Sequence, residues 1–209
     1  MLTHERKAWA EGCQYLVGID EAGRGPLAGP VVAGAVYMSP PFLEAEQDGV
    51  LVGLTDSKKL TVFQRNCFLA LFQDRPEISF ATGSASVEEV DELNVLRATH
   101  LAMRRAVEAL SLAPDHLLVD GLPVKDLPVS ATAIVKGDAS SLLIAAASVV
   151  AKVTRDKMMV RLSEEFPGYG LGRNKGYGTP EHIKAIQNHG PAACHRKSFT
   201  PIRQLRFDF

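Results

Sequence analysis

The chain has 209 residues, 46% of them hydrophobic and 22% charged, with a formal net charge of −1 at pH 7, ordinary values for a soluble globular protein. No segment approaches the ~18 consecutive apolar residues of a membrane-spanning helix, and the N-terminal stretch lacks the apolar run of a signal peptide, so we expect neither a membrane protein nor a secreted one. The three cysteines, Cys13, Cys67 and Cys194, form no CxxC pair, which argues against a disulfide framework or a zinc site and favours the cytoplasm.

Apolar runs and turn signals predict the elements of the first half of the chain. Short apolar or alternating runs predict strands, which we place at 15–20, 30–38, 50–54 and 77–86. The paired prolines and acids of 38–49 predict a loop. Apolar residues near helical spacing predict helices at 61–74, with Thr61 as the N-cap, and at 87–112.

The second half begins with two further strands, predicted at 116–120 and 129–135. The longest helical pattern covers 140–165, and its consecutive alanines followed by Ser148 leave little bulk, so we expect it to lie close against a sheet. A glycine-rich loop follows at 166–182, and a short helix runs from Pro180 to Gly190. This order of elements predicts a mixed α/β fold with an antiparallel start and later crossover helices.

Charge is unevenly distributed along the chain. Residues 151–209 hold 11 Lys and Arg against 5 Asp and Glu, whereas the acids concentrate in residues 1–150. Such asymmetry suits a phosphate-rich partner bound by the basic part. Solvated helix faces would give the same counts, so charge alone leaves both interpretations open.

Acidic residues follow three of the predicted strands. Asp20 and Asp120 end strands, Asp138 follows another, and Glu21 is adjacent to the first. Because ligand sites of α/β sheets lie outside the carboxyl ends of strands, these acids can converge at one sheet edge. Carboxylates that crowd together raise one another's pKa unless a cation offsets them. Oxygen-only ligands favour Mg²⁺ or Mn²⁺, and two such ions ~3.5–4 Å apart promote phosphodiester cleavage.

Each acid also has a structural interpretation. An aspartate at a strand end commonly stabilises a turn, and Asp138 could cap the following helix. Adjacent strand residues point to opposite faces, so Asp20 and Glu21 serve one site only if the strand ends there. Alternatively, Glu21 could contribute its backbone carbonyl.

The segment EAGRGPLAGP after the first strand is rich in glycine. It has neither the GxxxxGK[ST] of a phosphate-binding P-loop nor the GxGxxG spacing of a dinucleotide fold. Glycines at 23 and 25 would let a nucleic-acid backbone approach closely, with Arg24 as a phosphate ligand. Exposed backbone groups also suit a ribose 2′-hydroxyl, which both donates and accepts hydrogen bonds.

Taken together, these motifs resemble the bacterial ribonuclease HII family. The similarity is carried by GIDEAGRGPLAGPVV (18–32), DSKKL (56–60), LLVDG (117–121), KGD (136–138), IAAASVVAKVTRD (144–156), NKGYGT (174–179) and HRKSFTPI (195–202). The resemblance implies a ribonuclease H-like catalytic domain over 1–165 and a loop and helical substrate-binding extension over 166–209. It implies hydrolysis of RNA in RNA–DNA hybrids and incision 5′ of single ribonucleotides in duplex DNA, leaving 3′-hydroxyl and 5′-phosphate ends.

The resemblance also implies roles for individual residues. The four catalytic, metal-binding acids of the family match Asp20, Glu21, Asp120 and Asp138, with Mn²⁺ or Mg²⁺ as the cofactor. Substrate-binding positions match the following residues: Gly23, Arg24 and Gly25 at the 2′-hydroxyl, Tyr177 on the sugar, and Ser57, Lys58 and Lys136 near phosphates. We treat a pairing of Arg155 with Asp156 as structural.

The C-terminal segment QLRFDF (204–209) places apolar and aromatic residues after a glutamine. An extended peptide of this kind could insert Leu205, Phe207 and Phe209 into the pockets of a sliding clamp. These side chains could equally fold back onto the domain. We take the protein to be a monomer.

Two other functions remain open from the sequence. An actin-like small-molecule kinase or ATPase also begins with a strand, an acid and a glycine loop, and ATP hydrolysis without nucleic acid would identify it. A non-catalytic nucleic-acid binder would use only the basic C-terminal part, and the absence of cleavage would identify it.

Overall fold

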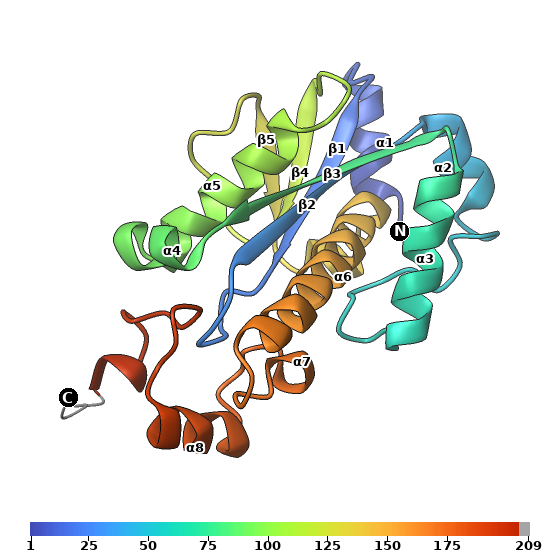
Figure 1. The fold of residues 1–209 in the computed structure, drawn as a ribbon. Coiled ribbons are helices and arrows are strands. Elements are labelled where there is room, and N and C mark those ends of the chain that lie inside the picture. The colour runs from blue at the N-terminus through green and yellow to red at the C-terminus, as the bar shows by residue number, and fades with distance from the viewer. Residues whose placement is uncertain (205–209) are drawn as a thin grey trace.

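The computed structural model describes residues 1–204, which form a five-stranded mixed sheet with helices on both faces (Figure 1). The strands are β1 (Leu16–Ala22), β2 (Val31–Met38), β3 (Ile78–Ala85), β4 (His116–Asp120) and β5 (Ala131–Ile134), in the spatial order β3-β2-β1-β4-β5. The β1–β2 and β2–β3 pairs are antiparallel, whereas β1–β4 and β4–β5 are parallel. The predicted mixed α/β fold with an antiparallel start is therefore confirmed.

Helices cover the sheet and continue beyond it. They are α1 (Thr3–Ala10), α2 (Pro40–Glu46), α3 (Val62–Asp74), α4 (Val87–Leu93), α5 (Val95–Glu108), α6 (Leu142–Glu165), α7 (Leu171–Asn174) and α8 (Pro180–His189), with 3₁₀ turns η1 (Gly137–Ala139) and η2 (Ile202–Gln204). Two buried apolar clusters fill the space between the sheet and the helices, one built on α6 and the other on α5. Within residues 1–204, the helices are too short or too polar to cross a membrane.

Helix α6 lies unusually close to the sheet. A Cβ atom at Gly18 would lie 2.2 Å from the Leu143 carbonyl carbon, and one at Gly34 would lie 2.5 Å from the Ala147 carbonyl oxygen. Gly18 and Gly34 thus face the backbone of the helix, which lies close against the sheet, as the sequence predicts. This close approach brings Ser148 of α6 beside Asp20 of β1.

Three local predictions differ from the structure, and one helix was not predicted. The predicted loop at 38–49 contains α2, because Pro40 and Pro41 occupy the first turn of a helix, where no amide donor is needed. The predicted strand at 50–54 is a turn. The predicted helix at 87–112 is two helices, since Asn94 has a φ of 67° and caps α5 through its side chain. Helix α1 was not predicted.

The chain after α6 forms a third apolar cluster of its own. Met159 of α6, Leu171, Ile186 and Cys194 are buried in it. The segment also contains α7, within the stretch predicted as a loop, and α8, which begins at Pro180 as predicted. Figure 1 shows this region beyond the C-terminal end of α6, with η2 as its last described element.

Candidate active site

Three of the four predicted acids lie on neighbouring parts of the sheet edge. Ile19 pairs with Val119 in the parallel β1–β4 ladder, so Asp20 and Asp120 are the next residues of adjacent strands. The Gly137 amide donates to Asp120 Oδ1 at 2.7 Å, which ties η1, and with it Asp138, to the end of β4. The structure therefore brings together acids that are far apart in the sequence.

Asp20 is the most buried member of this group, with 6% of its surface exposed. Burial raises its pKa well above the usual range, and the charges of Glu21 and Asp120 raise it further, while hydrogen bonds from the Glu21 amide and Ser148 oppose the shift. Burial likewise raises the pKa of Asp138, with added repulsion from Asp120 and Asp56. Carboxylates held in this way favour a bound cation.

The predicted end of the first strand at Asp20 is wrong, because β1 continues to Ala22. Side chains alternate along a strand, so Asp20 lies on the α6 side with Gly18, and Glu21 leaves from the opposite face. The Glu21 Oε1 atom accepts a hydrogen bond from Arg24 Nη1 at 3.2 Å. Burial raises the pKa of Glu21, and the charge of Arg24 opposes that shift.

The donor set fits a hard divalent cation in chemistry, although it is not a closed cage. Within residues 1–204, no group of three or more His, Cys, Asp or Glu side chains is arranged as a complete metal site. One oxygen of Asp20 and one of Asp120 accept from backbone amides instead. The other donors are carboxylate oxygens, the ligands that Mg²⁺ and Mn²⁺ prefer.

The glycine loop and Tyr177 lie together beside these acids. A Cβ at Gly25 would be 3.9 Å from Tyr177 Cε1, and the Tyr177 side chain is exposed. Gly23 has a φ of 101° and leaves no room for a Cβ, which would lie 2.1 Å from Arg155 Nε. The exposed Arg24 side chain stands between the two glycines.

Arg155 supports this loop and does not pair with Asp156, so the predicted pairing is wrong. The guanidinium donates to the carbonyls of Pro30, Ala28 and Lys175, each at 3.0 Å. Asp156 instead accepts from Lys152 Nζ at 2.6 Å. A buried guanidinium with five donors can satisfy several backbone carbonyls at once.

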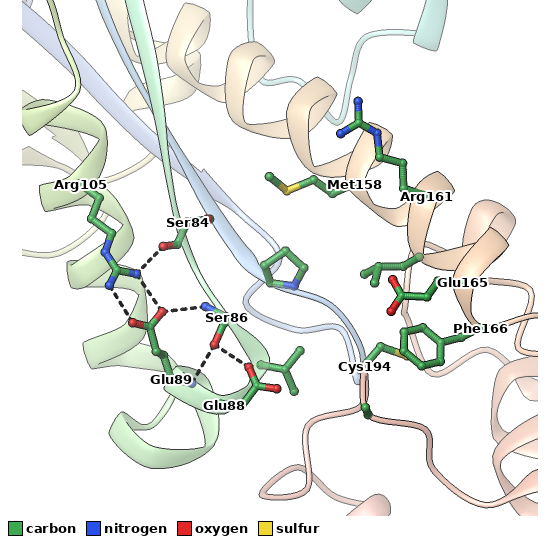
Figure 2. A pocket seen from close by; sticks show the side chains of 14 residues that line it. Ser84, Ser86, Glu88, Glu89, Arg105, Met158, Arg161, Glu165, Phe166 and Cys194 are labelled. Atoms are coloured by element: carbon green, nitrogen blue, oxygen red, sulfur yellow. Dashed lines mark hydrogen bonds and ion pairs between the residues drawn. The ribbon is translucent and has the colours of Figure 1, made fainter.

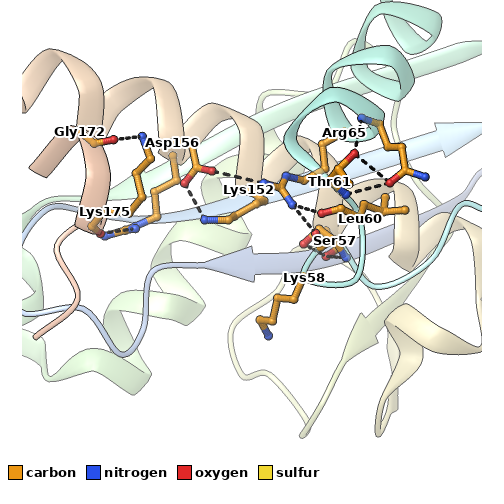
Figure 3. Close-up of polar contacts among 12 residues, drawn as sticks. Ser57, Lys58, Leu60, Thr61, Arg65, Lys152, Asp156, Gly172 and Lys175 are labelled. Carbon is orange, nitrogen blue, oxygen red and sulfur yellow. Dashed lines mark hydrogen bonds and ion pairs between the residues drawn. The ribbon is translucent and has the colours of Figure 1, made fainter. Parts of the chain in front are cut away.

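The loop carrying Ser57 and Lys58 is held from within the protein (Figure 3). Arg65 Nη1 donates to the carbonyls of Ser57 and Leu60. The Ser57 side chain is buried and its hydroxyl lies 2.7 Å from that of Ser148, so it faces the core. Lys58 is exposed and extends away from this network in Figure 3. Lys136, also exposed, adopts a left-handed conformation just before Asp138.

Two residues of the site were not identified from the sequence. Ser148 contacts both Asp20 and Ser57, and the small-residue pattern of α6 marked it only for close packing. Asp56 lies near Asp138 and raises its pKa. The sequence feature that could have identified Asp56 was its position in the motif DSKKL, two residues before Lys58.

A separate cavity of about 600 Å³ lies between the β3–α4 connection and the C-terminal half of α6 (Figure 2). Glu89, which pairs with Arg105 at 2.7 Å, lines one side, and Arg161 and Phe166 line the other. The cavity contains none of the four acids. The candidate site is therefore an open sheet edge and not this cavity.

A mixed sheet with carboxylates at the ends of its central strands, beside a glycine loop, places the protein in the ribonuclease H-like fold class. The family model described as Ribonuclease HII matches residues 17–202. The chain belongs to the ribonuclease HII family. It is accordingly a hydrolase, an endonuclease that acts on the RNA of RNA–DNA hybrids, and this decides against the kinase and the non-catalytic binder.

Relatives in sequence and in structure agree with this assignment. A ribonuclease HII of Cereibacter sphaeroides is 50% identical over 206 residues, which cover 98% of this chain and 93% of the relative. A ribonuclease HII of Myxococcus xanthus is 46% identical over 204 residues, which cover 98% of this chain and 67% of the relative. The solved ribonuclease H2 of Pyrococcus horikoshii superposes with a TM-score of 0.74 at 25% identity, covering 91% of this chain and 96% of that chain. A chain of the PCNA:RNase HII complex of Archaeoglobus fulgidus superposes with a TM-score of 0.71 at 26% identity, covering 93% of this chain and 98% of that chain.

Proposed function

We propose that this enzyme, besides cutting long hybrids, incises duplex DNA on the 5′ side of a single embedded ribonucleotide and leaves 3′-hydroxyl and 5′-phosphate ends. The observation that carries this proposal is the position of Tyr177 over Gly25, next to the acidic sheet edge. An aromatic ring and exposed loop amides on one surface suit a sugar that presents a 2′-hydroxyl. One such sugar is enough to be recognised, so a continuous RNA strand is not required.

Asp20, Asp120 and Asp138 are the proposed metal-binding and catalytic carboxylates, with Mg²⁺ or Mn²⁺ as the ion. Two bound ions would supply an activated water and stabilise the leaving oxygen. Glu21 is the fourth acid; its side chain accepts from Arg24, and its charge interacts with those of Asp20 and Asp120. Burial and the mutual repulsion of the acids make the binding of a cation favourable.

The remaining predicted residues bind substrate in this proposal. Gly23, Arg24 and Gly25 contact the 2′-hydroxyl, and Tyr177 stacks on the sugar. The exposed Lys58 and Lys136 lie near phosphates, whereas the buried Ser57 shapes the loop through its backbone. We assign residues 1–165 to the catalytic domain, whose loops also contact substrate, and residues 166–209 to a substrate-binding extension, in a monomer that works in the cytoplasm.

The C-terminal peptide Gln204–Phe209 is proposed to bind a sliding clamp. Residues 205–209 lie outside the described part of the chain, so the proposal rests on the sequence pattern and on the solved PCNA:RNase HII complex. Main-chain pairing together with pockets for alternate side chains would provide the binding energy.

Incision of a duplex that carries one ribonucleotide tests the central proposal. With Mg²⁺ or Mn²⁺ present, we expect a single cut 5′ of that residue, with end-group mapping giving a 3′-hydroxyl and a 5′-phosphate. The same duplex with a 2′-deoxy or 2′-O-methyl residue at that position is the matched control and should stay intact. A cut on the 3′ side, or cleavage of long hybrids only, would contradict the proposal.

A further inference from the structure

The dipeptide His195–Arg196 lies directly behind the glycine loop. His195 forms an isolated antiparallel bridge with Ala28, and the Arg196 amide donates to the Leu27 carbonyl at 2.8 Å. Both side chains are buried, with 1% and 0% exposed. Buried polar side chains need hydrogen-bond partners, so what these two bind is informative.

Arg196 binds the loop through its backbone carbonyls. Its guanidinium donates to Gly23 at 2.7 Å, to Arg24 at 3.0 Å and to Gly29 at 2.7 and 3.0 Å. Within residues 1–204, Arg196 makes no ion pair with an acidic side chain. Four of the five N–H donors of this charged group are therefore used to hold the shape of one loop.

These bonds orient the amides of the loop. In a planar trans peptide, the carbonyl and the next amide point in opposite directions. With the Gly23 and Arg24 carbonyls turned inward to Arg196, the Arg24 and Gly25 amides face away from it. In the described part of the chain, neither amide donates to a backbone carbonyl. They are left as donors for an oxygen of the substrate.

His195 is linked to Tyr177 through His182. The Ala192 amide donates to His195 Nδ1 at 3.0 Å, so the proton of His195 lies on Nε2 and is donated to His182 Nε2 at 3.1 Å. His182 then donates from Nδ1 to the Tyr177 carbonyl at 2.9 Å. The Ala192 carbonyl also lies 3.2 Å from His195 Nδ1, but the reverse arrangement would place the bare Nδ1 lone pair of His182 against the Tyr177 carbonyl, which favours the first direction.

The dipeptide is itself anchored from a third side. Asp91 of α4 accepts from the Lys197 amide at 2.9 Å and from the Ser198 amide at 3.0 Å. Its carboxylate also offsets the charge of Arg196 at longer range. The segment thus has one fixed position between α4, the glycine loop and α8.

We propose that His195 and Arg196 are positioning residues that keep two parts of a ribose-contacting surface, the Arg24 and Gly25 amides and Tyr177, in fixed register. This inference rests on the proposed substrate role of those groups. Arg196 sets the direction of the two amides, and His195, acting through His182, sets the backbone that carries the tyrosine ring.

A double-mutant cycle tests the histidine connection. Single-turnover incision of a one-ribonucleotide duplex is measured for His182→Leu, Tyr177→Ala and the double variant. We expect His182→Leu to lose about 5- to 10-fold in rate, the range of one hydrogen bond, but less than about 2-fold when Tyr177 is already alanine. His182→Gln, which keeps a donor and an acceptor, should retain most of the rate and keeps the test valid if the leucine variant does not fold.

An equal loss from His182→Leu in both backgrounds would overturn the inference, as would a His182→Gln variant no better than His182→Leu. The proposed function fails in a different way. If Tyr177→Ala alone incises as fast as the unaltered enzyme, the tyrosine has no substrate role, whatever the histidines do.

Binding selectivity tests the arginine connection. In the Asp120→Asn background, the affinity for a one-ribonucleotide duplex is compared with that for the all-DNA duplex. Arg196→Lys keeps the charge but loses the planar fork, and we expect the ratio of the two affinities to fall about 5- to 10-fold. Asp91→Ala removes the carboxylate that anchors the segment from α4 and should also lower the ratio, whereas Arg75→Lys, at an exposed position at the end of α3, should leave it unchanged. An unchanged ratio in both Arg196→Lys and Asp91→Ala would overturn the proposal.

Discussion

At the scale of single residues, the site is dominated by carboxylates whose burial costs free energy when they are ionised. Asp20 is buried beside two other acids, and its hydrogen bonds offset only part of the penalty. Enzymes commonly keep such groups where they bind a cation or move a proton. The histidines of the C-terminal segment show the opposite solution, because burial lowers the pKa of His182 and of His195 and so favours their neutral forms.

Replacing Asp20 or Asp120 by asparagine is expected to abolish incision while substrate binding persists. Groups that offset charge in a transition state contribute about 100-fold or more each, so single-turnover rates should fall at least that far. Asp74→Asn, at an exposed position at the end of α3, is the matched control. Incision at the normal rate by either variant would exclude the proposed four-acid site.

The raised pKa of Asp20 also predicts a stability effect. Because the folded state holds the proton more tightly than the unfolded chain, ionisation of Asp20 destabilises the metal-free protein as the pH rises through and above the ordinary aspartate range. Asp20→Asn should therefore raise the melting temperature at pH 8, and the gain should shrink toward acidic pH. Added Mg²⁺ should stabilise the unaltered protein more than the variant. Equal responses of the two proteins to Mg²⁺ would speak against metal binding by this carboxylate.

The buried histidine pair predicts an acid-sensitive transition. Burial and the neighbouring His182 lower the pKa of His195 to about 4. Its contribution to stability is complete above the unfolded value of about 6.5 and is lost as the pH falls from there toward about 4. Melting curves between pH 8 and 4 should show this loss, and His195→Gln should reduce it. A variant with the same pH profile as the unaltered protein would contradict this origin.

At the scale of elements, α6 and the glycines of the sheet define where the site forms. Small residues on the helix meet Gly18 and Gly34, so the helix lies low enough for Ser148 to contact Asp20. The periodicity of α6 and the strand-end acids could be predicted from the sequence, because both are local patterns. Helix α2 could not, since Pro40 and Pro41 also suit a loop, and the break at Asn94 depends on one left-handed residue.

Gly34→Ala is expected to destabilise the protein by about 1–3 kcal/mol, the usual cost of overpacking. The added Cβ would lie 2.5 Å from the Ala147 carbonyl oxygen, a backbone atom that cannot turn away. Chemical denaturation measures the change. Gly172→Ala is the control, since its Cβ would meet only the Ser163 side chain, at 3.3 Å. Equal stability of the two variants would show that α6 can move outward freely.

At the scale of the whole molecule, the basic C-terminal part completes a site whose acids belong to the sheet. Family motifs in the sequence identified Gly25 and Tyr177 separately, and only the structure places one above the other. Arg196 lies in the motif HRKSFTPI, but that motif does not indicate its partners, because Gly23 and Gly29 lie more than 160 residues earlier in the chain. Long-range backbone contacts of this kind have no periodic signature in a sequence.

Removal of residues 204–209 is expected to separate clamp binding from catalysis. The truncated enzyme should lose at least about 10-fold in affinity for a sliding clamp, because the pockets for alternate side chains would stay empty. Its incision of a one-ribonucleotide duplex without the clamp should stay unchanged. Titration calorimetry with purified clamp measures the first quantity, and unchanged affinity would exclude the peptide as the binding segment.

The bonds between Arg196 and the glycine loop have a consequence for biosynthesis. The sheet and its acids can form once α6 has emerged from the ribosome, but the loop lacks its guanidinium until residue 196 has been translated and released. A nascent chain, or one truncated before residue 196, would therefore carry the proposed metal-binding carboxylates without an ordered form of the loop that we propose to contact the ribose. In our proposal, selectivity is thus acquired only after Arg196 has reached the loop, and it does not require residues 204–209.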